Sequence, residues 1–169
     1  TVNVAVAGEP GSLSPWVGNN FGRISTLGSV YQHLVETDGF GGEMVGVIMK
    51  GYEQVDERTF DMTIRDNVYD TAGNHITAAD VVFSYQTDID MGFHAGRLGV
   101  IEKLEKVDEY VVRWTFKTAP NDGDLCNVWI ESYIVSQKAY EDSGDEMAMK
   151  AVGTTPYQLV EYIPGTSLT

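Results

Sequence analysis

The stretch Gly51–Ile89, GYEQVDERTFDMTIRDNVYDTAGNHITAADVVFSYQTDI, combines two strand patterns, a tight turn and a capped helix without interruption. In its second strand, apolar residues alternate with polar ones at Phe60, Met62 and Ile64. This period-two pattern is typical of a strand with one buried face. The polar run 56–59 favours a turn back to Tyr52–Val55. We therefore predict a β-hairpin over residues 52–65, with the rest of the chain packed around it.

The second half of the stretch predicts a helix that begins after Thr77. A turn signal, Ala72-Gly73-Asn74, precedes it. Thr77 suits the N-cap position, and Asp80 places a carboxylate at the positive end of the helix. Val81, Val82 and Tyr85 lie on one helical face. The change from period two to helical spacing across one turn predicts a mixed α/β (α+β) fold, in which this helix packs on the sheet.

Other patterns predict the remaining elements. Residues 104–116 indicate a second hairpin that turns at Asp108-Glu109, and Ser136 caps a helix that runs to Asp142. Strands are predicted at Val2–Val6 and Tyr157–Ile163, and a helix at Arg23–Val35. A short helix followed by a strand is predicted over Leu125–Val135. We expect these side chains to be largely buried: Phe60, Met62, Ile64, Val81, Val82, Tyr85, Val112, Trp114 and Phe116.

Composition limits the classes of partner. The 169 residues can bury a core of their own, and the apolar fraction of 43% is normal for a folded domain. The formal charge of -14 argues against nucleic acid or an anionic membrane as the main partner. No apolar run approaches the length of a membrane span. Cys126 is the single cysteine, so an internal disulfide is excluded, and we expect a small buried hydrophobe there.

No catalytic or metal-binding motif stands out. The histidines His33, His75 and His94 are far apart and lack the spacing of a ligand set, so we predict neither a metal site nor a cofactor. Acidic pairs such as Asp88 with Asp90 imitate glycosidase carboxylates, but we expect them to be solvated surface. We therefore predict a binding protein without catalytic residues. The alternative is a hydrolase domain whose catalytic residues cannot be recognised from their spacing in the sequence.

The order of several motifs resembles one family across nearly the whole chain. A strand ending in Arg65-Asp66, an aromatic Tyr69 and a Gly-containing turn lead into the segment ITAADVVFSY, 76–85. Three more blocks occur in the same order: Leu13-Ser14-Pro15, Val30–Val35 (VYQHLV) and Val152–Leu159 (VGTTPYQL). Together they resemble the peptide/nickel (oligopeptide/dipeptide-binding) family of extracytoplasmic solute-binding proteins, the binding subunits of ABC importers. Ser14 and Thr155 depart from the Asp and Gly that are usual there.

The resemblance implies a periplasmic-binding-protein-like fold in which two lobes close over a solute. It implies that residues 1–42 begin lobe I, 43–151 form an inserted accessory subdomain, and 152–169 return into lobe I. The chain ends in mid-element, so we expect an N-terminal fragment from which the second lobe is absent. The resemblance also implies an exported, extracytoplasmic monomer that delivers its solute to a membrane permease. A signal peptide upstream, with a possible lipid anchor, is implied as well.

The resemblance places the solute site partly on the loop before the first helix, at Asn19, Asn20 and Phe21. Amide side chains both donate and accept hydrogen bonds, which suits an extended peptide. Trp16, Phe93 and His94 also lie on predicted loops and are candidate contacts, although Trp16 and Phe21 are equally suited to packing in a neighbouring core. Peptide is the first choice of solute. An oligosaccharide or a nickel chelate remains the alternative.

Overall fold

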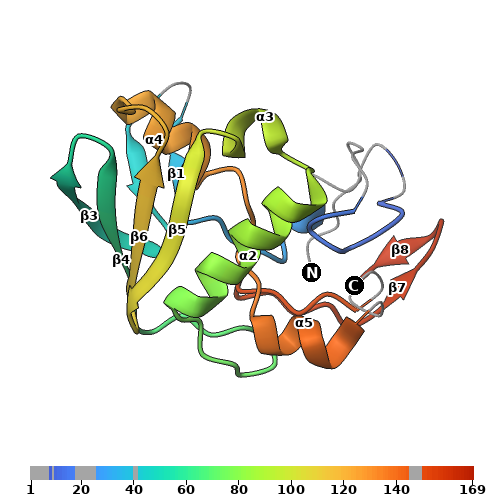
Figure 1. Ribbon diagram of the computed structural model, residues 1–169. Helices are drawn as coiled ribbons and strands as arrows, with labels where there is room; N and C mark the ends of the chain where they lie inside the picture. The colour runs from blue at the N-terminus through green and yellow to red at the C-terminus, as the bar shows by residue number, and fades with distance from the viewer. Residues whose placement is uncertain (1–7, 9, 18–25, 40–41, 145–149) are drawn as a thin grey trace.

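The centre of the molecule is an antiparallel sheet with the strand order β3-β4-β6-β5 (Figure 1). The computed structural model describes residues 8, 10–17, 26–39, 42–144 and 150–169. The four strands are β3 (Met49–Asp56), β4 (Thr59–Ile64), β5 (Ile101–Asp108) and β6 (Val111–Phe116). Both predicted hairpins are therefore confirmed, and the pairing of β4 with β6 joins them into one sheet.

The alternating pattern of the sequence gives the sheet one apolar face. Phe60 lies opposite Trp114, and Met62 lies opposite Val112; all four side chains are buried. On the other face the Arg113 guanidinium donates to both carboxylate oxygens of Asp61, at 2.7 and 2.6 Å. Period-two alternation thus sends apolar side chains to the core and charged ones to solvent.

Helices α2 (Ala78–Met91) and α4 (Asp122–Trp129) contribute to the first core, on the apolar face of the sheet. The Tyr85 ring meets Trp114 edge-on with centroids 4.8 Å apart, and Trp114 lies 6.0 Å from Trp129. The predicted helix at 78–86 is confirmed. The expected burial is confirmed as well, except that Val82 is only partly buried.

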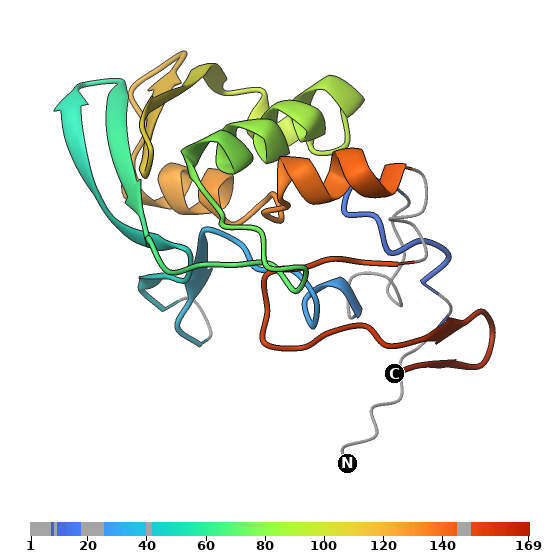
Figure 2. The same cartoon turned by 90° about the horizontal axis from the view of Figure 1, so that it is seen from below.

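A second core lies on the other side of α2. It joins residues 13–16 and 27–31 to α5 (Gln137–Ser143) and to residues 151–152. Figure 2 shows α5 beside α2. Ser136 caps α5 as predicted, because its hydroxyl accepts from the Ala139 N–H at 3.3 Å. The proposed division of the chain at 42/43 and 151/152 stays a prediction.

The predicted helix over 23–35 is wrong for its second half. Of the described residues in that range, Thr26 and Leu27 are helical, and β1 (Val35–Thr37) is a strand paired with β2 (Met44–Gly46). The carbonyls of Val30, Gln32 and Leu34 accept from the N–H groups of Thr155, Ile134 and Val47. These long-range hydrogen bonds replace the helical ones, so tertiary pairing overrides the local period.

Three other segments differ from the prediction. Helix α2 runs on to Met91, and a short helix α3 (Ala95–Leu98) occupies part of the predicted loop 90–99. After α4 the chain is irregular where a strand was predicted. The strand predicted at 157–163 is reduced to β7 (Tyr162–Ile163), which pairs with β8 (Ser167–Leu168). The predicted strand Val2–Val6 lies outside the described residues.

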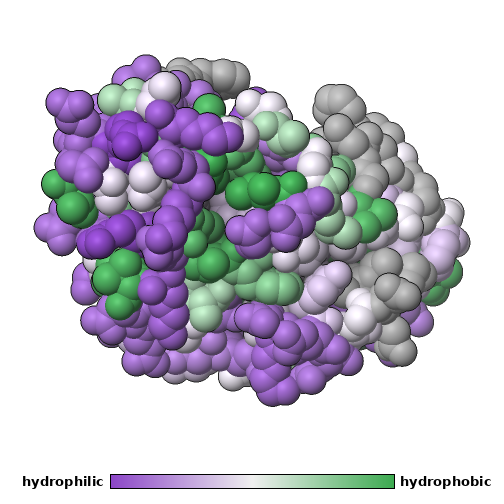
Figure 3. Space-filling model, in the orientation of Figure 1, coloured by the Kyte–Doolittle hydropathy of each residue, from purple (hydrophilic) through white to green (hydrophobic). Residues whose placement is uncertain are grey.

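Hydrophilic residues dominate much of the surface in the view of Figure 3, as the large negative charge leads one to expect (Figure 3). Hydrophobic residues gather near the middle of this face, where Figure 1 places α2 and β5. Within the described residues, no helix has both the length and the apolar character that crossing a membrane requires.

Candidate functional site

A line of buried polar side chains runs along one face of α2. Asp80, Ser84 and Asp88 are spaced four residues apart, which places them on the same face of the helix. Their exposed fractions are 8%, 0% and 1%. Buried polar groups require hydrogen-bond partners; Asp80 and Ser84 bind residues 135–137, and Asp88 binds His94.

Asp80 and Ser84 attach α2 to the segment that leads into α5. One carboxylate oxygen of Asp80 accepts from the Thr77 N–H and hydroxyl, at 2.8 and 2.9 Å, and the other accepts from the Gln137 N–H at 2.9 Å. The Ser84 hydroxyl accepts from the Val135 N–H at 3.0 Å. The helix cap predicted from the sequence therefore also fixes the position of residues 135–137.

Asp88 binds the histidine that follows the helix. Gly92, at a positive φ of 67°, ends α2 and reverses the chain so that His94 returns to the last turn. Nδ1 of His94 lies 2.8 Å and 3.0 Å from the two carboxylate oxygens of Asp88. The expectation that Asp88 is solvated surface is wrong, because the helical period places it on the buried face with Asp80 and Ser84.

Two more charged residues complete what we call the His94 cluster: Asp88, His94, Arg97 and Glu131. Glu131 follows α4 and places one carboxylate oxygen 3.4 Å from Nε2 of His94. Its other oxygen accepts from the Arg97 guanidinium of α3. The cluster therefore joins the end of α2, α3 and the segment after α4.

Aromatic and titratable groups surround the cluster. The His33 ring stacks on Tyr133 with centroids 4.1 Å apart. Burial, reinforced by the nearby His94, lowers the pKa of His33 to about 4. Burial also raises the pKa of Tyr85, and the carboxylates of Asp88 and Glu131 add to this effect. Tyr85 is therefore a neutral donor, and its hydroxyl donates to the Trp129 carbonyl at 2.9 Å.

The low pKa of His33 predicts a loss of stability in acid. Between pH 6.5 and about 4, the unfolded chain binds a proton at this residue and the folded protein does not. The free energy of unfolding should therefore fall by roughly 3 kcal/mol as the pH decreases through this window, at about 1.4 kcal/mol per pKa unit. His33→Phe keeps an aromatic ring against Tyr133 and removes the titration.

Urea unfolding at several pH values between 4 and 7.5 measures this effect. As the pH falls, the free energy of unfolding should decrease more steeply for the unaltered protein than for His33→Phe. Parallel curves for the two proteins would contradict the assignment. Because other groups titrate equally in both proteins, the comparison isolates His33.

Of the three predicted contact residues that the structure describes, two lie together and one lies apart. Phe93 and His94 are adjacent and partly buried, with their rings 4.4 Å apart. Trp16 is 3% exposed and packs edge-on against Phe83 and Tyr140 in the second core, so the alternative of core packing holds for this residue. Asn19, Asn20 and Phe21 lie outside the described residues.

Sequence reasoning missed the grouping of Arg97 and Glu131 with His94, and of His33 and Tyr133 beside them. They lie on three segments separated by most of the chain, and no local motif relates them. One signal was available for Asp88, because the i, i+4, i+8 spacing of Asp80, Ser84 and Asp88 places it on the same side of the helix as the buried Val81 and Tyr85. Such a face indicates bound partners rather than solvated carboxylates.

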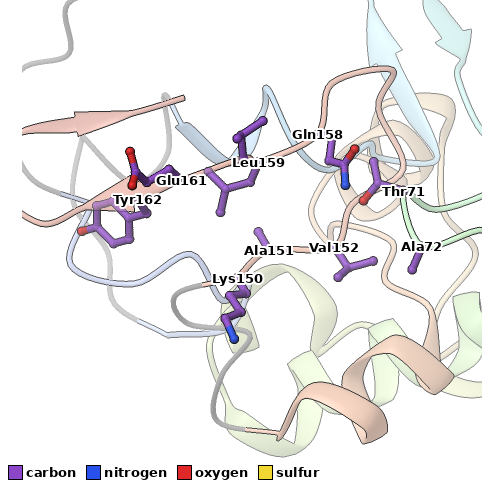
Figure 4. Close-up of a pocket in the computed structure, with 10 residues that line it drawn as sticks. Thr71, Ala72, Lys150, Ala151, Val152, Gln158, Leu159, Glu161 and Tyr162 are labelled. Carbon is purple, nitrogen blue, oxygen red and sulfur yellow. The ribbon is translucent and has the colours of Figure 1, made fainter.

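Two surface pockets lie in the described part of the chain. The larger, of about 460 Å³, lies between residues 150–152 and 158–162, with Thr71 and Ala72 at one end (Figure 4). The smaller, of about 290 Å³, is lined by Arg97 of the His94 cluster and by residues of α4. Among the described residues, no group of three or more His, Cys, Asp or Glu side chains is arranged to hold a metal ion. Cys126 is partly buried against the first core.

The sequence matches a known protein family over most of its length. The sequence model of the bacterial extracellular solute-binding proteins, family 5, middle region, matches residues 43–169. The chain belongs to this family. Family 5 is a family of solute-binding proteins described as extracellular, so the resemblance seen in the motifs is confirmed. No curated protein sequence matches the chain at a significant level.

Solved structures of solute-binding proteins share the fold. MoaA of A. tumefaciens R10, in complex with mannopinic acid, is 24% identical with a TM-score of 0.84 over 95% of this chain. The oligopeptide-binding AppA of Bacillus subtilis, with a nonapeptide, is 20% identical with a TM-score of 0.83 over 95%. DppA of Helicobacter pylori, with the peptide STSA, is 22% identical with a TM-score of 0.77 over 93%. The family 5 chain spans 34%, 34% and 36% of their lengths.

Proposed function

We propose that the protein captures extracellular peptides and delivers them to the permease of an ABC importer. The observation that carries this proposal is the family 5 match over residues 43–169. The similar structures include two with bound peptides, AppA and DppA, which favours peptide as the solute. In this function affinity arises from enclosure of the solute, without a catalytic step.

The proposed solute surface includes the His94 cluster with the His33–Tyr133 stack. These groups offer what peptide recognition requires, namely carboxylates, a partly buried imidazole and aromatic face, and an exposed guanidinium. Phe93 and His94 remain proposed contacts, and so do Asn19, Asn20 and Phe21. We also propose an extracytoplasmic location, with a lipid anchor upstream as one means of retention at the membrane, and action as a monomer.

The expected result is that the full-length protein carries short peptides through purification. Native mass spectrometry, followed by denaturation and sequencing of the released solutes, identifies them. The double variant Asn19→Ala, Phe21→Ala should reduce peptide affinity by about tenfold or more, since hot-spot contacts typically cost more than 1 kcal/mol each. Its thermal unfolding should stay close to that of the unaltered protein.

Two outcomes would redirect the proposal. Release of a sugar or a metal complex would identify another solute; the mannopinic acid bound to MoaA is one example of a different solute on the same fold. Turnover of model esters, peptides or glycosides would favour the hydrolase alternative. Unchanged peptide affinity in the double variant would remove Asn19 and Phe21 from the site.

A further inference from the structure

The sequence contains two Asp-Gly pairs, at 38–39 and at 122–123. In such a pair, the backbone nitrogen of glycine can approach the side-chain carboxyl group of aspartate, and glycine has no side chain that shields its nitrogen. Both pairs therefore carry the groups for the same intramolecular reaction. The structure places them in different backbone surroundings, and these surroundings decide which pair reacts.

The first pair lies in the loop that joins β1 to β2. Asp38 and Gly39 are both exposed, and Gly39 has a positive φ of 71°. The Asp38 backbone N–H donates to the Glu43 carbonyl at 3.0 Å, which closes this end of the loop. Among the described residues, no hydrogen bond forms to the Asp38 carboxylate or from the Gly39 N–H. The carboxyl group of Asp38 is therefore free to turn toward the Gly39 nitrogen.

The second pair begins α4, where Asp122 is the first helical residue. The Asn121 side chain accepts from the Asp124 N–H at 3.0 Å, and the Asp124 carboxylate accepts from the Asn121 N–H at 3.1 Å. These two hydrogen bonds hold the first turn in helical conformation. Ring closure requires a different ψ at Asp122 from the helical value of about −42°, so this turn has to open first. Asp122 and Gly123 are also exposed, so access of water does not distinguish the two pairs.

The reaction is the closure of the aspartate side chain on the next backbone nitrogen. The Gly39 nitrogen attacks Cγ of Asp38, a C–N bond forms, and the hydroxyl of the protonated carboxyl group leaves as water with the N–H proton. The product is a five-membered succinimide, to which one water then adds. Cleavage of the bond between the nitrogen and Cγ restores aspartate. Cleavage of the bond between the nitrogen and the backbone carbonyl carbon gives isoaspartate, in which the chain continues through Cγ.

We propose that Asp38-Gly39 is a site of spontaneous isoaspartate formation, and that α4 protects Asp122-Gly123 from the same reaction. The modification goes beyond peptide capture, because it requires water and no solute. Isoaspartate keeps the mass and charge of aspartate but adds one backbone atom between residues 38 and 39. The backbone of Gly42 packs directly against the Asp38 carbonyl, since a Cβ on Gly42 would overlap this oxygen. The longer backbone displaces that carbonyl, so the loop between β1 and β2 changes its path.

The test follows isoaspartate in the full-length protein during storage at pH 7.5 and 37 °C. Enzymatic methylation of isoaspartyl carboxyl groups, followed by peptide mapping, measures the modified fraction at each pair. Isoaspartate should accumulate at least about tenfold faster at 38–39 than at 122–123, because the helical pair reacts only after local opening. In a second sample, unfolded in guanidinium chloride, this protection is removed and the two rates should be close to each other.

The matched variants are Asp38→Glu and Asp122→Glu. Glutamate keeps the carboxylate but would have to close a six-membered ring, which forms far more slowly than the five-membered one. Asp38→Glu should therefore remove the signal from the β1–β2 loop. Asp122→Glu should leave the rate at 38–39 unchanged. Thermal unfolding of each variant verifies that it is folded.

Three outcomes would contradict the assignment. Equal rates at the two pairs in the folded protein would show that α4 gives no protection. A difference that persists in guanidinium chloride would attribute it to the neighbouring residues in the sequence rather than to the fold. Absence of isoaspartate from 38–39, or a signal that survives in Asp38→Glu, would remove Asp38-Gly39 as the site. Because the measurement uses no solute, each of these outcomes leaves the proposal of peptide capture standing.

Discussion

Gly153→Ala should destabilise the protein by about 3 kcal/mol or more. A Cβ at this position would lie 1.9 Å from the Val30 carbonyl oxygen and 2.5 Å from its carbon. Both are backbone atoms, so no side-chain rotation relieves the overlap. The displaced Val30 carbonyl also accepts from the Thr155 N–H at 3.1 Å, and that hydrogen bond would be lost as well. A backbone overlap together with a lost hydrogen bond places Gly153→Ala among the most destabilising single substitutions.

Gly96→Ala is the matched control. Gly96 lies in the exposed helix α3, and a Cβ there meets no atom within 4 Å. This control should be neutral or stabilising by up to about 1 kcal/mol, because alanine is the better helix former. Urea unfolding followed by tryptophan fluorescence measures both variants. A Gly153→Ala protein as stable as the control would show that residues 30 and 153 do not approach as closely as described.

Asp80→Ala should cost about 3 kcal/mol. The substitution removes the acceptor of three hydrogen bonds, two from Thr77 and one from the Gln137 N–H, and leaves these donors without their partner. Loss of the helix cap alone typically costs about 1 kcal/mol. The rest comes from the connection to α5, which Asp80 holds through the Gln137 N–H.

Asp90→Ala, at the exposed end of the same helix, is the control for Asp80→Ala. Asp90 accepts only an exposed hydrogen bond from Gln86, at 2.8 Å, and its negative charge lies at the unfavourable end of the helix. Its loss should change stability by less than about 0.5 kcal/mol. Amide hydrogen exchange adds a local measurement: the Gln137 N–H should exchange faster in Asp80→Ala and at the original rate in Asp90→Ala. Equal exchange in both would place the loss of stability elsewhere.

The sequence determined those elements whose signals are local. The hairpin of β3 and β4 follows from alternation around Phe60, Met62 and Ile64, and α2 follows from a turn, a capping residue and an apolar face within one stretch. Neighbouring residues decide these features, so no distant contact is needed to predict them. The order of motifs also identified the family, because it extends over nearly the whole chain.

Only the tertiary structure decided where local conformational preferences were overridden and which polar groups form hydrogen bonds or ion pairs with one another. Residues 31–34 have a helical pattern but lose the helix to hydrogen bonds with Ile134, Val47 and Thr154. Asp88 has the sequence context of a surface carboxylate, yet α2 buries it against His94. The His94 cluster joins parts of the chain that lie far apart in sequence, and hydrogen bonds and ion pairs of this kind exist only after packing has brought their partners together.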